Sequence, residues 1–476
     1  MKILVTGATG YIGGRLIPKL LDRGLEVRAF AREPNLLRGR KWADRVEIFK
    51  GDLNDRSSIE QAAKGCDAAY FLVHAMYSGE NFAEKEKLYA ENFAEAAKDL
   101  PNVIYLGGLL PEEKATSEHL ESRANVGEIL RQRGNCTEFR AGPIIGSGSA
   151  SFEMVRYLTE RIPIMTVPKW VKNPVQPIAV RDVIDYLAAS LDKEPLGVVD
   201  IGANILSFGG MMEVFAEIRG LKRIIIPVPV LTPLLSGLWV GLVTPIPNSL
   251  ALPLVKGIIT PVLANLTKAE KHFPGIKPMG YREAVRLALT NIEKKAVETR
   301  WRVSAKDDES YDLTDKEGLI REVRMVLTDA PPDTVFRSFT SIGGENGWLA
   351  WRWAWEIRGL LDSLIGGPGL SRGRRHPTEL FVGEELDFWR VEDIQENKLL
   401  LLRAEMKVPG KAWLQFEAAP IDGKTQLIQT ALFAPKGLLG FLYWYSFYPA
   451  HYFIFEKMAQ QIVKNAELEA ESPSSN

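Results

Sequence analysis

The stretch KILVTGATGYIGG, residues 2–14, joins a short apolar run to a set of closely spaced glycines. Ile3–Thr6 has the composition of a buried strand, and Tyr11–Arg23 that of a helix that ends at Gly24. A glycine turn between them lets backbone N–H groups approach a phosphate at the positive end of the helix dipole. We therefore expect a dinucleotide-binding turn rather than a tight turn that binds nothing. Its predicted binding residues are Gly7, Thr9, Gly10, Tyr11, Ile12 and Gly13.

The same alternation of strand and helix continues to about residue 140. Strands are expected at Leu25–Ala31, Val46–Lys50, Ala68–His74 and Val103–Leu106. Helices are expected at Ser57–Lys64, Phe82–Asp99 and Ser122–Arg133. Strands that alternate with helices at this spacing predict an α/β fold with a doubly wound, parallel sheet of the Rossmann type.

The composition is that of a globular protein. Of 476 residues, 46% are hydrophobic and 25% charged, which excludes a disordered or fibrous chain. The net charge of −1 gives no reason to expect a nucleic-acid partner. Two cysteines, Cys66 and Cys136, exclude a disulfide framework, and they show no metal-ligand spacing with the five histidines. The apolar start is too short for a signal peptide, so we expect a cytoplasmic protein, either soluble or peripheral to the inner face of the membrane.

The end of the second predicted strand indicates which dinucleotide binds. A carboxylate at this place accepts hydrogen bonds from the ribose 2′-OH of NAD. Here the sequence has Arg32, whose guanidinium suits a 2′-phosphate, and this favours NADP(H). The alternative is a solvated Arg32 with Glu33 on the ribose. Asp52, with Leu53 beside it, follows the third strand and is a candidate for the adenine amino group or for a loop cap.

Together these segments resemble the atypical, extended-like short-chain dehydrogenase/reductases. The resemblance covers about residues 1–290 and is carried by TGATGYIGG, by GDL at 51–53, by FLVHAM at 71–76 and by residues 120–123, 137–143 and 176–183. It implies bound NADP and a substrate region after the sixth strand. It also implies that Leu72, Val73 and His74 line the nicotinamide ribose, and that residues from Gly142 to Ile144 lie near the nicotinamide.

The sequence departs from this family at the catalytic pair. Such reductases carry Tyr-x-x-x-Lys, in which the lysine lowers the tyrosine pKa. Here His119 and Arg123 stand at the two places, and a shift of one residue gives Leu120 and Ala124. His119 and Arg123 are therefore candidate catalytic residues, the alternative being two surface residues of a helix. His74 is a third candidate because it ends the fourth strand, and its alternative role is to cap a loop.

Residues 224–267 form a distinct apolar segment. Lys256 is its only charge, and six prolines fall in its first 32 residues. The longest run without proline, 234–244, would span about 16 Å as a helix, which is half of a bilayer core. Three roles remain open for this segment: contact with the second domain or another subunit, insertion into a lipid surface, and the lining of an apolar substrate pocket.

The charged residues 291–318 predict a linker, and residues 319–470 a separate α+β domain. In this domain we expect strands at Leu319–Leu327, Leu386–Val391, Lys398–Lys407, Ala412–Ala418 and Thr425–Phe433. The expected helices are Asp333–Phe339, Trp351–Leu364 and a final helix from about Leu438 to Glu469. This order resembles the START-like, polyketide-cyclase type helix-grip fold. The resemblance implies an apolar ligand between helix and sheet.

These features support a hypothesis and two alternatives. The hypothesis is an NADP-dependent oxidoreductase of an apolar carbonyl, isoprenoid or quinone-like substrate that the C-terminal domain shelters. Because the Tyr-Lys pair is missing, the first alternative is an NADP(H) sensor without catalysis. The second is a protein that binds a lipid or quinone at a membrane surface.

Overall fold

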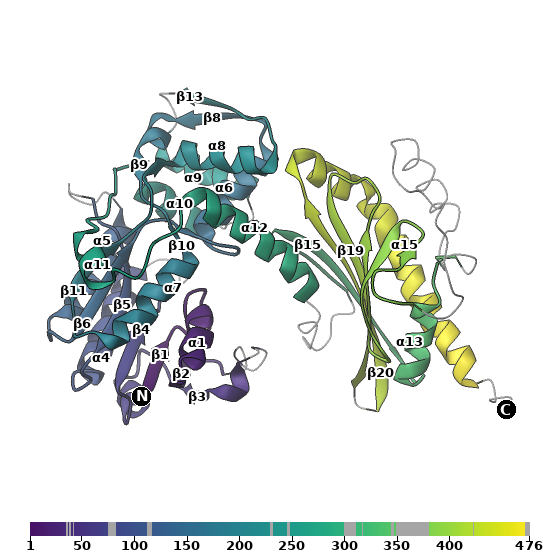
Figure 1. Ribbon diagram of the computed structural model, residues 1–476, viewed down its shortest axis with the longest axis horizontal. Coiled ribbons are helices and arrows are strands. Elements are labelled where there is room, and N and C mark those ends of the chain that lie inside the picture. Colours follow the sequence, from purple (N-terminus) through teal and green to yellow (C-terminus); the bar gives the residue numbers. More distant parts are fainter. Residues whose placement is uncertain are drawn as a thin grey trace. The chain divides into compact units, whose positions relative to one another are not determined.

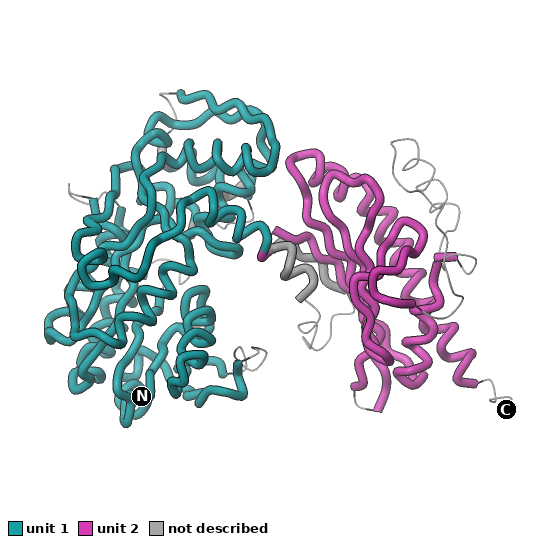
Figure 2. Tube along the Cα trace, viewed as in Figure 1, with its two compact units in different colours: residues 1–290 teal, residues 291–476 magenta. Residues whose placement is uncertain are grey.

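The computed structural model describes residues 1–34, 37, 40, 42–74, 82–111, 117–228, 232–244, 248–298, 311–316, 318–343, 347–348, 380–421 and 423–471. The chain divides into two compact units, residues 1–290 and residues 291–476 (Figure 2). Each unit has its own central sheet, and each is described by itself.

Unit 1 is built on a seven-stranded parallel sheet (Figure 1). Its strand order is β11–β6–β5–β4–β1–β2–β3, and every neighbouring pair is parallel. The strands are β1 Lys2–Thr6, β2 Glu26–Ala31, β3 Glu47–Lys50, β4 Ala68–Phe71, β5 Val103–Gly108, β6 Cys136–Ala141 and β11 Gly197–Ile201. The order reverses between β1 and β4, which is the position where ligands bind in open α/β sheets. The doubly wound sheet is thus confirmed.

Helices cover both faces of this sheet because its strands are apolar on both sides. In β1, Ile3 and Val5 share one apolar cluster with Leu16 of α1, whereas Leu4 lies in a second cluster with Ile59 of α3 and Phe93 of α4. The alternation follows from the two-residue period of a strand. The helices are α1 Gly13–Asp22 and α7 Val180–Ala189 on one face, and α3 Arg56–Ala63, α4 Phe82–Ala96 and α5 Glu118–Arg131 on the other.

The rest of unit 1 forms a smaller, largely helical part beyond the sheet (Figure 1). Its helices are α6 Ala150–Arg161, α8 Phe208–Arg219, α9 Pro233–Val243 and α10 Asn248–Gly257. The helix α11 Thr267–His272 packs on the sheet through Ala269, and α12 Tyr281–Glu298 continues past the end of the unit. Its short strand pairs are β7 Ile144–Ile145 with β10 Ile178–Ala179, β9 Pro174–Val175 with β12 Leu206–Ser207, and β8 Ile164–Pro168 with β13 Ile224–Val228. The short helices η1 Ala43–Arg45, η3 Lys169–Lys172 and η4 Ser190–Asp192 complete the unit.

Unit 2 is an antiparallel sheet with a long helix, which confirms the expected α+β class. The strand order is β14–β15–β20–β19–β18–β17–β16. The strands are β14 Tyr311–Lys316, β15 Leu319–Thr328, β16 Glu385–Leu386, β17 Trp389–Gln395, β18 Leu399–Ala404, β19 Gly410–Ile421 and β20 Lys424–Pro435. The helices are α13 Pro332–Thr340 and α15 Gly437–Glu471. The finer START-like resemblance stays a prediction.

The helix α15 is attached to the sheet by stacked rings and by a buried arginine of β15. Trp444 stacks on Phe433 of β20 with 5.3 Å between ring centroids. Arg324 of β15 is 2.7 Å from the Glu322 carboxylate and donates a 3.0 Å hydrogen bond to the carbonyl of Tyr452. Both charged side chains are buried, and a buried charge needs a partner of opposite charge because water cannot solvate it.

Two predicted segments need correction. The predicted linker at 291–318 is partly regular structure, because α12 continues to Glu298 and β14 occupies Tyr311–Lys316. Charged residues are compatible with both elements, so composition alone misled the prediction. The helix expected from Ser122 begins at Glu118 instead, which puts His119 on it. The helix expected at Trp351–Leu364 lies outside the described residues.

Candidate functional site

The turn after β1 leaves no room for side chains at two of its glycines. Gly7 has a φ of +74°, and a Cβ there would lie 2.5 Å from the carbonyl oxygen of Leu72. A Cβ on Gly13 would lie 2.3 Å from the carbonyl oxygen of Gly7. At these two positions the backbone of the turn approaches the neighbouring backbone too closely for any residue other than glycine. Such a close approach is what a dinucleotide turn needs.

The helix that follows the turn starts without a side-chain cap. No side chain accepts a hydrogen bond from the first turn of α1, and this turn holds no acidic residue. Instead Arg15 lies over the ring of Tyr11, 3.9 Å from its centroid, and donates a 2.9 Å hydrogen bond to the carbonyl of Ser147. The positive end of the helix is thus open to an anion. This arrangement fits a pyrophosphate.

The residues predicted to bind the adenosine half of the dinucleotide lie at the ends of β2 and β3. Arg32 directly follows β2, is exposed, and makes no hydrogen bond or ion pair with a described residue. Asp52 lies just beyond β3, and its Oδ1 accepts 2.9 and 3.0 Å hydrogen bonds from the backbone and side-chain amides of Asn54. Asp52 therefore caps its own loop, as the alternative prediction had it. Its second oxygen is not used in this cap.

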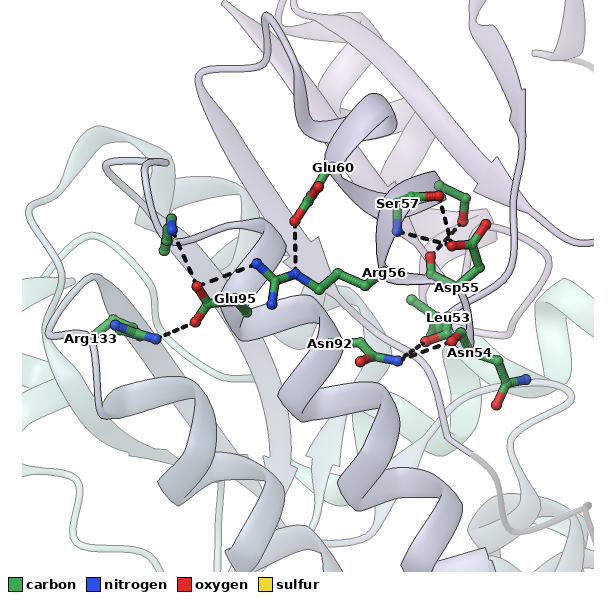
Figure 3. Close-up of polar contacts among 11 residues, drawn as sticks. Leu53, Asn54, Asp55, Arg56, Ser57, Glu60, Asn92, Glu95 and Arg133 are labelled. Atoms are coloured by element: carbon green, nitrogen blue, oxygen red, sulfur yellow. Dashed lines mark hydrogen bonds and ion pairs between the residues drawn. The ribbon is translucent and has the colours of Figure 1, made fainter.

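A polar network holds the loop after β3 in place (Figure 3). Asn92 of α4 donates hydrogen bonds of 2.9 and 3.3 Å to the carbonyls of Leu53 and Asn54. On the same pair of helices, Arg56 of α3 bonds Glu60 at 2.7 Å and Glu95 of α4 at 3.4 Å. These contacts join α3 to α4 and orient the Asp52–Leu53 backbone at the sheet edge.

Leu72, Val73 and His74 follow β4 without a break, and Gly142 to Ile144 follow β6. A Cβ on Gly142 would lie 2.2 Å from the carbonyl oxygen of Gln176, so the backbones of these two segments are in close contact. Because β1, β4 and β6 are parallel, these segments lie at the same edge of the sheet as the glycine turn. All predicted cofactor residues are thus gathered at one edge.

The three candidate catalytic residues lie in one cluster. The rings of His74 and His119 are stacked with 4.9 Å between centroids. Arg123 lies one turn along α5 from His119, donates to the carbonyl of Leu106, and stands 5.0 Å from the ring centroid of Tyr105. The structure therefore brings together residues from the end of β4 and from α5.

Glu86 of α4 is a member of this cluster that sequence reasoning missed. One carboxylate oxygen is hydrogen bonded to Nδ1 of His74, and the other accepts a 2.5 Å hydrogen bond from Oγ of Ser122. The Glu86 side chain is only 3% exposed, whereas that of His74 is 30% exposed. A signal did exist in the sequence, because Glu86 shares a helical face with the buried Ala90 and Phe93.

The electrostatics of the cluster favour an ionised Glu86 beside neutral histidines. Burial raises the pKa of Glu86, but the hydrogen bond from His74, the charge of Arg123 and the hydrogen bond from Ser122 lower it to about 2. Burial and the Arg123 charge lower the pKa of His74. Burial, His74 and Arg123 lower the pKa of His119 to about 3. An ionised carboxylate only accepts hydrogen bonds, so His74 holds its proton on Nδ1 and leaves Nε2 unprotonated.

Tyr105 does not replace the missing tyrosine. Its side chain is fully buried, and its hydroxyl donates a 3.2 Å hydrogen bond to the carbonyl of Arg123. Burial raises the pKa of Tyr105 to about 12, which makes it a poor acid at neutral pH. The cluster therefore offers imidazoles and no accessible phenol among its described members.

The helical part of unit 1 holds an apolar cavity of about 360 Å³. Its walls come from α6, β8, α8, α9 and α10, so part of the apolar segment 224–267 lines it. The lining includes Met154, Phe208, Met212, Trp239 and Val255. The helix α10 also reaches α5, where a Cβ on Gly257 would lie 4.0 Å from Cδ1 of Leu120. Leu120 is the neighbour of His119, so one helix joins the cavity wall to the cluster.

Two segments of the chain match protein-family models. Residues 7–125 match a family described as NAD(P)H-binding. Residues 318–458 match a family described as a protein of unknown function, DUF2867. The first match contains the glycine turn, Arg32, Asp52, His74 and His119.

Curated relatives resemble only part of the chain. A 3 beta-hydroxysteroid dehydrogenase/Delta 5-->4-isomerase of Mycobacterium tuberculosis is 38% identical over 106 residues, which are 22% of this chain and 28% of that protein. A dihydroflavonol 4-reductase of Arabidopsis thaliana is 36% identical over 81 residues, or 16% and 21% of the two chains. The chain therefore matches less than a third of the length of these relatives.

A solved structure supports the fold of unit 1. The triphenylmethane reductase of Citrobacter sp. superimposes with a TM-score of 0.50 at 18% identity, and covers 61% of this chain and 100% of that one. At this identity the similarity concerns the fold alone. Unit 1 thus has a Rossmann-like fold, and its residues 7–125 match the family described as NAD(P)H-binding.

Proposed function

We propose that this protein is an NADP(H)-dependent oxidoreductase that acts on an apolar carbonyl or the corresponding alcohol. The observation that carries the proposal is the cluster of His74, Glu86 and His119 at the sheet edge that also holds the glycine turn. When bound, NADPH supplies a hydride to the carbonyl carbon, and one proton is then needed at the carbonyl oxygen.

Preference for NADP(H) over NAD(H) rests on Arg32. Its guanidinium is exposed at the end of β2 and engages no described residue, so it is available to a 2′-phosphate. Glu33 is also exposed and is the residue that would instead hold a ribose hydroxyl. A bidentate guanidinium–phosphate contact is the stronger of the two interactions.

The proton reaches the substrate oxygen through the imidazole pair. Neutral His119 has one N–H to donate to a carbonyl oxygen, as a neutral imidazole can. His74 is oriented by Glu86, and its unprotonated Nε2 accepts the proton when the alcohol is oxidised. In the direction of reduction, solvent water supplies a proton to Nε2 of His74, and His74 passes this proton to the substrate oxygen. Arg123 is a positioning residue, because its guanidinium is bonded to the backbone of Leu106.

The apolar cavity accounts for the class of substrate. Its side chains are aliphatic, aromatic and sulfur-containing, and among the described lining residues only Thr166 and Ser236 carry a hydroxyl. A volume of about 360 Å³ fits a ring system or a prenyl-like chain better than a sugar, which would need many hydrogen-bond partners. An isoprenoid or quinone-like carbonyl meets this requirement. Shelter of the substrate by unit 2 remains a prediction.

The test is the oxidation of NADPH by purified protein with a panel of apolar carbonyls and quinones. We expect turnover with at least one of them, and its loss when both His74 and His119 are replaced by alanine. Native mass spectrometry of the untreated protein identifies any apolar ligand that co-purifies. NADPH binding without turnover on every compound would instead favour the NADP(H) sensor, which the missing Tyr-Lys pair also suggests.

A further inference from the structure

One corner of unit 1 exposes a group of large apolar side chains. On α9, Leu234, Leu235, Leu238 and Trp239 are between 43% and 56% exposed. Their spacing puts them on one side of the helix. A patch of this kind is unusual on a protein surface that only meets water.

The strand pair β8–β13 exposes a second group of large apolar side chains. Ile224 is paired with Ile164 in parallel register, and Ile226 follows two residues later on the same face of β13. These three isoleucines are between 44% and 60% exposed. We call the combined patch the α9–β13 face. It consists of Ile164, Ile224, Ile226, Leu234, Leu235, Leu238 and Trp239.

The α9–β13 face borders the apolar cavity. Leu235 and Trp239 line the cavity and are also about half exposed. Met165 and Val167 of β8 line the cavity from the strand side. The cavity wall and the exposed face therefore share residues, so a molecule bound in the cavity lies directly behind this face.

The charged residues in the segments that form the face are all positive. Residues 162–181 and 218–269 contain no aspartate or glutamate, and these are the segments that β8 and β13 bring together. Lys169, Lys172 and Lys222 are exposed and form no ion pair with a described residue. Leucine and tryptophan beside unpaired lysines are the composition of a surface that inserts into the headgroup layer of an anionic bilayer.

We propose that the α9–β13 face docks on the surface of an anionic phospholipid bilayer, and that the cavity behind it takes its apolar ligand from that bilayer. Among the described helices none is long and apolar enough to cross a membrane. The 11 residues of α9 extend about 16 Å, so this helix lies in the interface. The docking itself is independent of the redox chemistry, whereas the supply of substrate from the bilayer rests on the proposed function.

The experiment is flotation of the full-length protein with two kinds of vesicle. One kind is phosphatidylcholine alone, and the other contains roughly one-third phosphatidylglycerol. We expect binding to the anionic vesicles, about tenfold weaker binding to the neutral ones, and release by high salt.

Three variants make the test specific. The double variant Leu234→Glu with Leu238→Glu should lower the bound fraction on anionic vesicles about tenfold. Neither residue lines the cavity. Lys169→Glu with Lys222→Glu should reduce binding to anionic vesicles and leave binding to neutral ones unchanged. The control is Leu88→Glu on α4, because Leu88 is 43% exposed like Leu238. It should float like the unchanged protein.

Thermal melts of each variant establish that it is folded. The proposal is overturned if the unchanged protein stays unbound with both vesicles, or if the folded double leucine variant floats equally well. It is also overturned if that variant instead converts a dimer to a monomer in light scattering, since the face then joins two copies of the chain. NADPH binding is measured on the same samples, so floating protein that binds no NADPH would contradict the proposed function and leave the docking surface intact.

Discussion

The imidazole rings of His74 and His119 lie face to face, with 4.9 Å between centroids and 9° between planes. Stacked rings cannot hydrogen bond to each other through their ring edges, so each imidazole is available to a different partner. His74 uses Nδ1 for Glu86. His119 has a buried Nδ1 without a hydrogen-bond partner. The pair is therefore only partly satisfied by the described protein, as expected for groups that meet a substrate.

Replacement of His119 by alanine should reduce turnover at least about 100-fold on any substrate that the unchanged protein reduces. Affinity for NADPH should remain, because the glycine turn is untouched. Steady-state kinetics with a fluorescence titration of NADPH separates the two quantities. Full turnover in this variant would remove His119 from the mechanism and direct attention to His74.

The variant Glu86→Gln should show that Glu86 acts through His74. Glutamine keeps the shape but loses the charge that holds the His74 proton on Nδ1. We expect turnover to fall with little change in KM, and the pH profile to shift because the base is no longer oriented. Ser122→Ala, which removes the second hydrogen bond to Glu86, is the matched milder variant. An unchanged pH profile in Glu86→Gln would assign Glu86 a structural role only.

Stability should fall in mild acid because His119 stays neutral when folded. Its pKa is about 3 in the folded protein and about 6.5 in an unfolded chain. Between these values the unfolded state binds the extra proton, so stability is full above about pH 6.5 and is lost as the pH falls toward 3. One such group contributes at most about 1.4 kcal/mol per pH unit. Melts of His119→Gln across this range should show a shallower decline, and an identical decline would contradict the assignment.

Cofactor choice is tested at Arg32. The variant Arg32→Ala should weaken NADPH binding by about 1–3 kcal/mol and leave NADH binding nearly unchanged. Calorimetric titration with both nucleotides measures this difference, with Glu33→Ala as the neighbouring control. Equal weakening of the two nucleotides would exclude a 2′-phosphate contact.

The glycine turn can be tested with a matched pair of alanine variants. In Gly13→Ala the new Cβ would lie 2.3 Å from a backbone oxygen, so the turn must deform and NADPH affinity should drop. In Gly14→Ala the nearest atom is 3.6 Å away, which is an ordinary contact, and affinity should be kept. A titration of both variants checks this, and equal affinities would show that the turn does not hold the nucleotide.

Several features of unit 1 can be predicted from the sequence because they depend on residues that are close together in the chain. The strand–turn–helix of residues 2–22, the parallel sheet and the arginine after β2 all follow from local composition and spacing. The prediction failed where the composition fits more than one kind of structure. Residues 291–318 have the composition of a charged linker, yet charged residues are equally compatible with the last turns of α12.

The aromatic residues of α15 also show that composition alone does not decide which side chains are buried. Its rings suggest a buried core, but only some of them face the sheet. Phe441, Trp444 and Phe455 are buried, whereas Tyr445 and Phe453 are about half exposed. A run of rings longer than one helical face must leave some of them outside.

The sequence by itself determined the Rossmann-like class, the glycine turn and the positions of His74, His119 and Arg123, since each depends on residues close together in the chain. Only the tertiary structure decided that Glu86 completes the cluster. Glu84, Lys85, Glu86 and Lys87 are four successive charged residues, and the packing of α4 against α5 selects the one that is buried. The cavity likewise arises only when α6, β8, α8, α9 and α10 meet, because a cavity is a property of surfaces brought together and no single segment contains it.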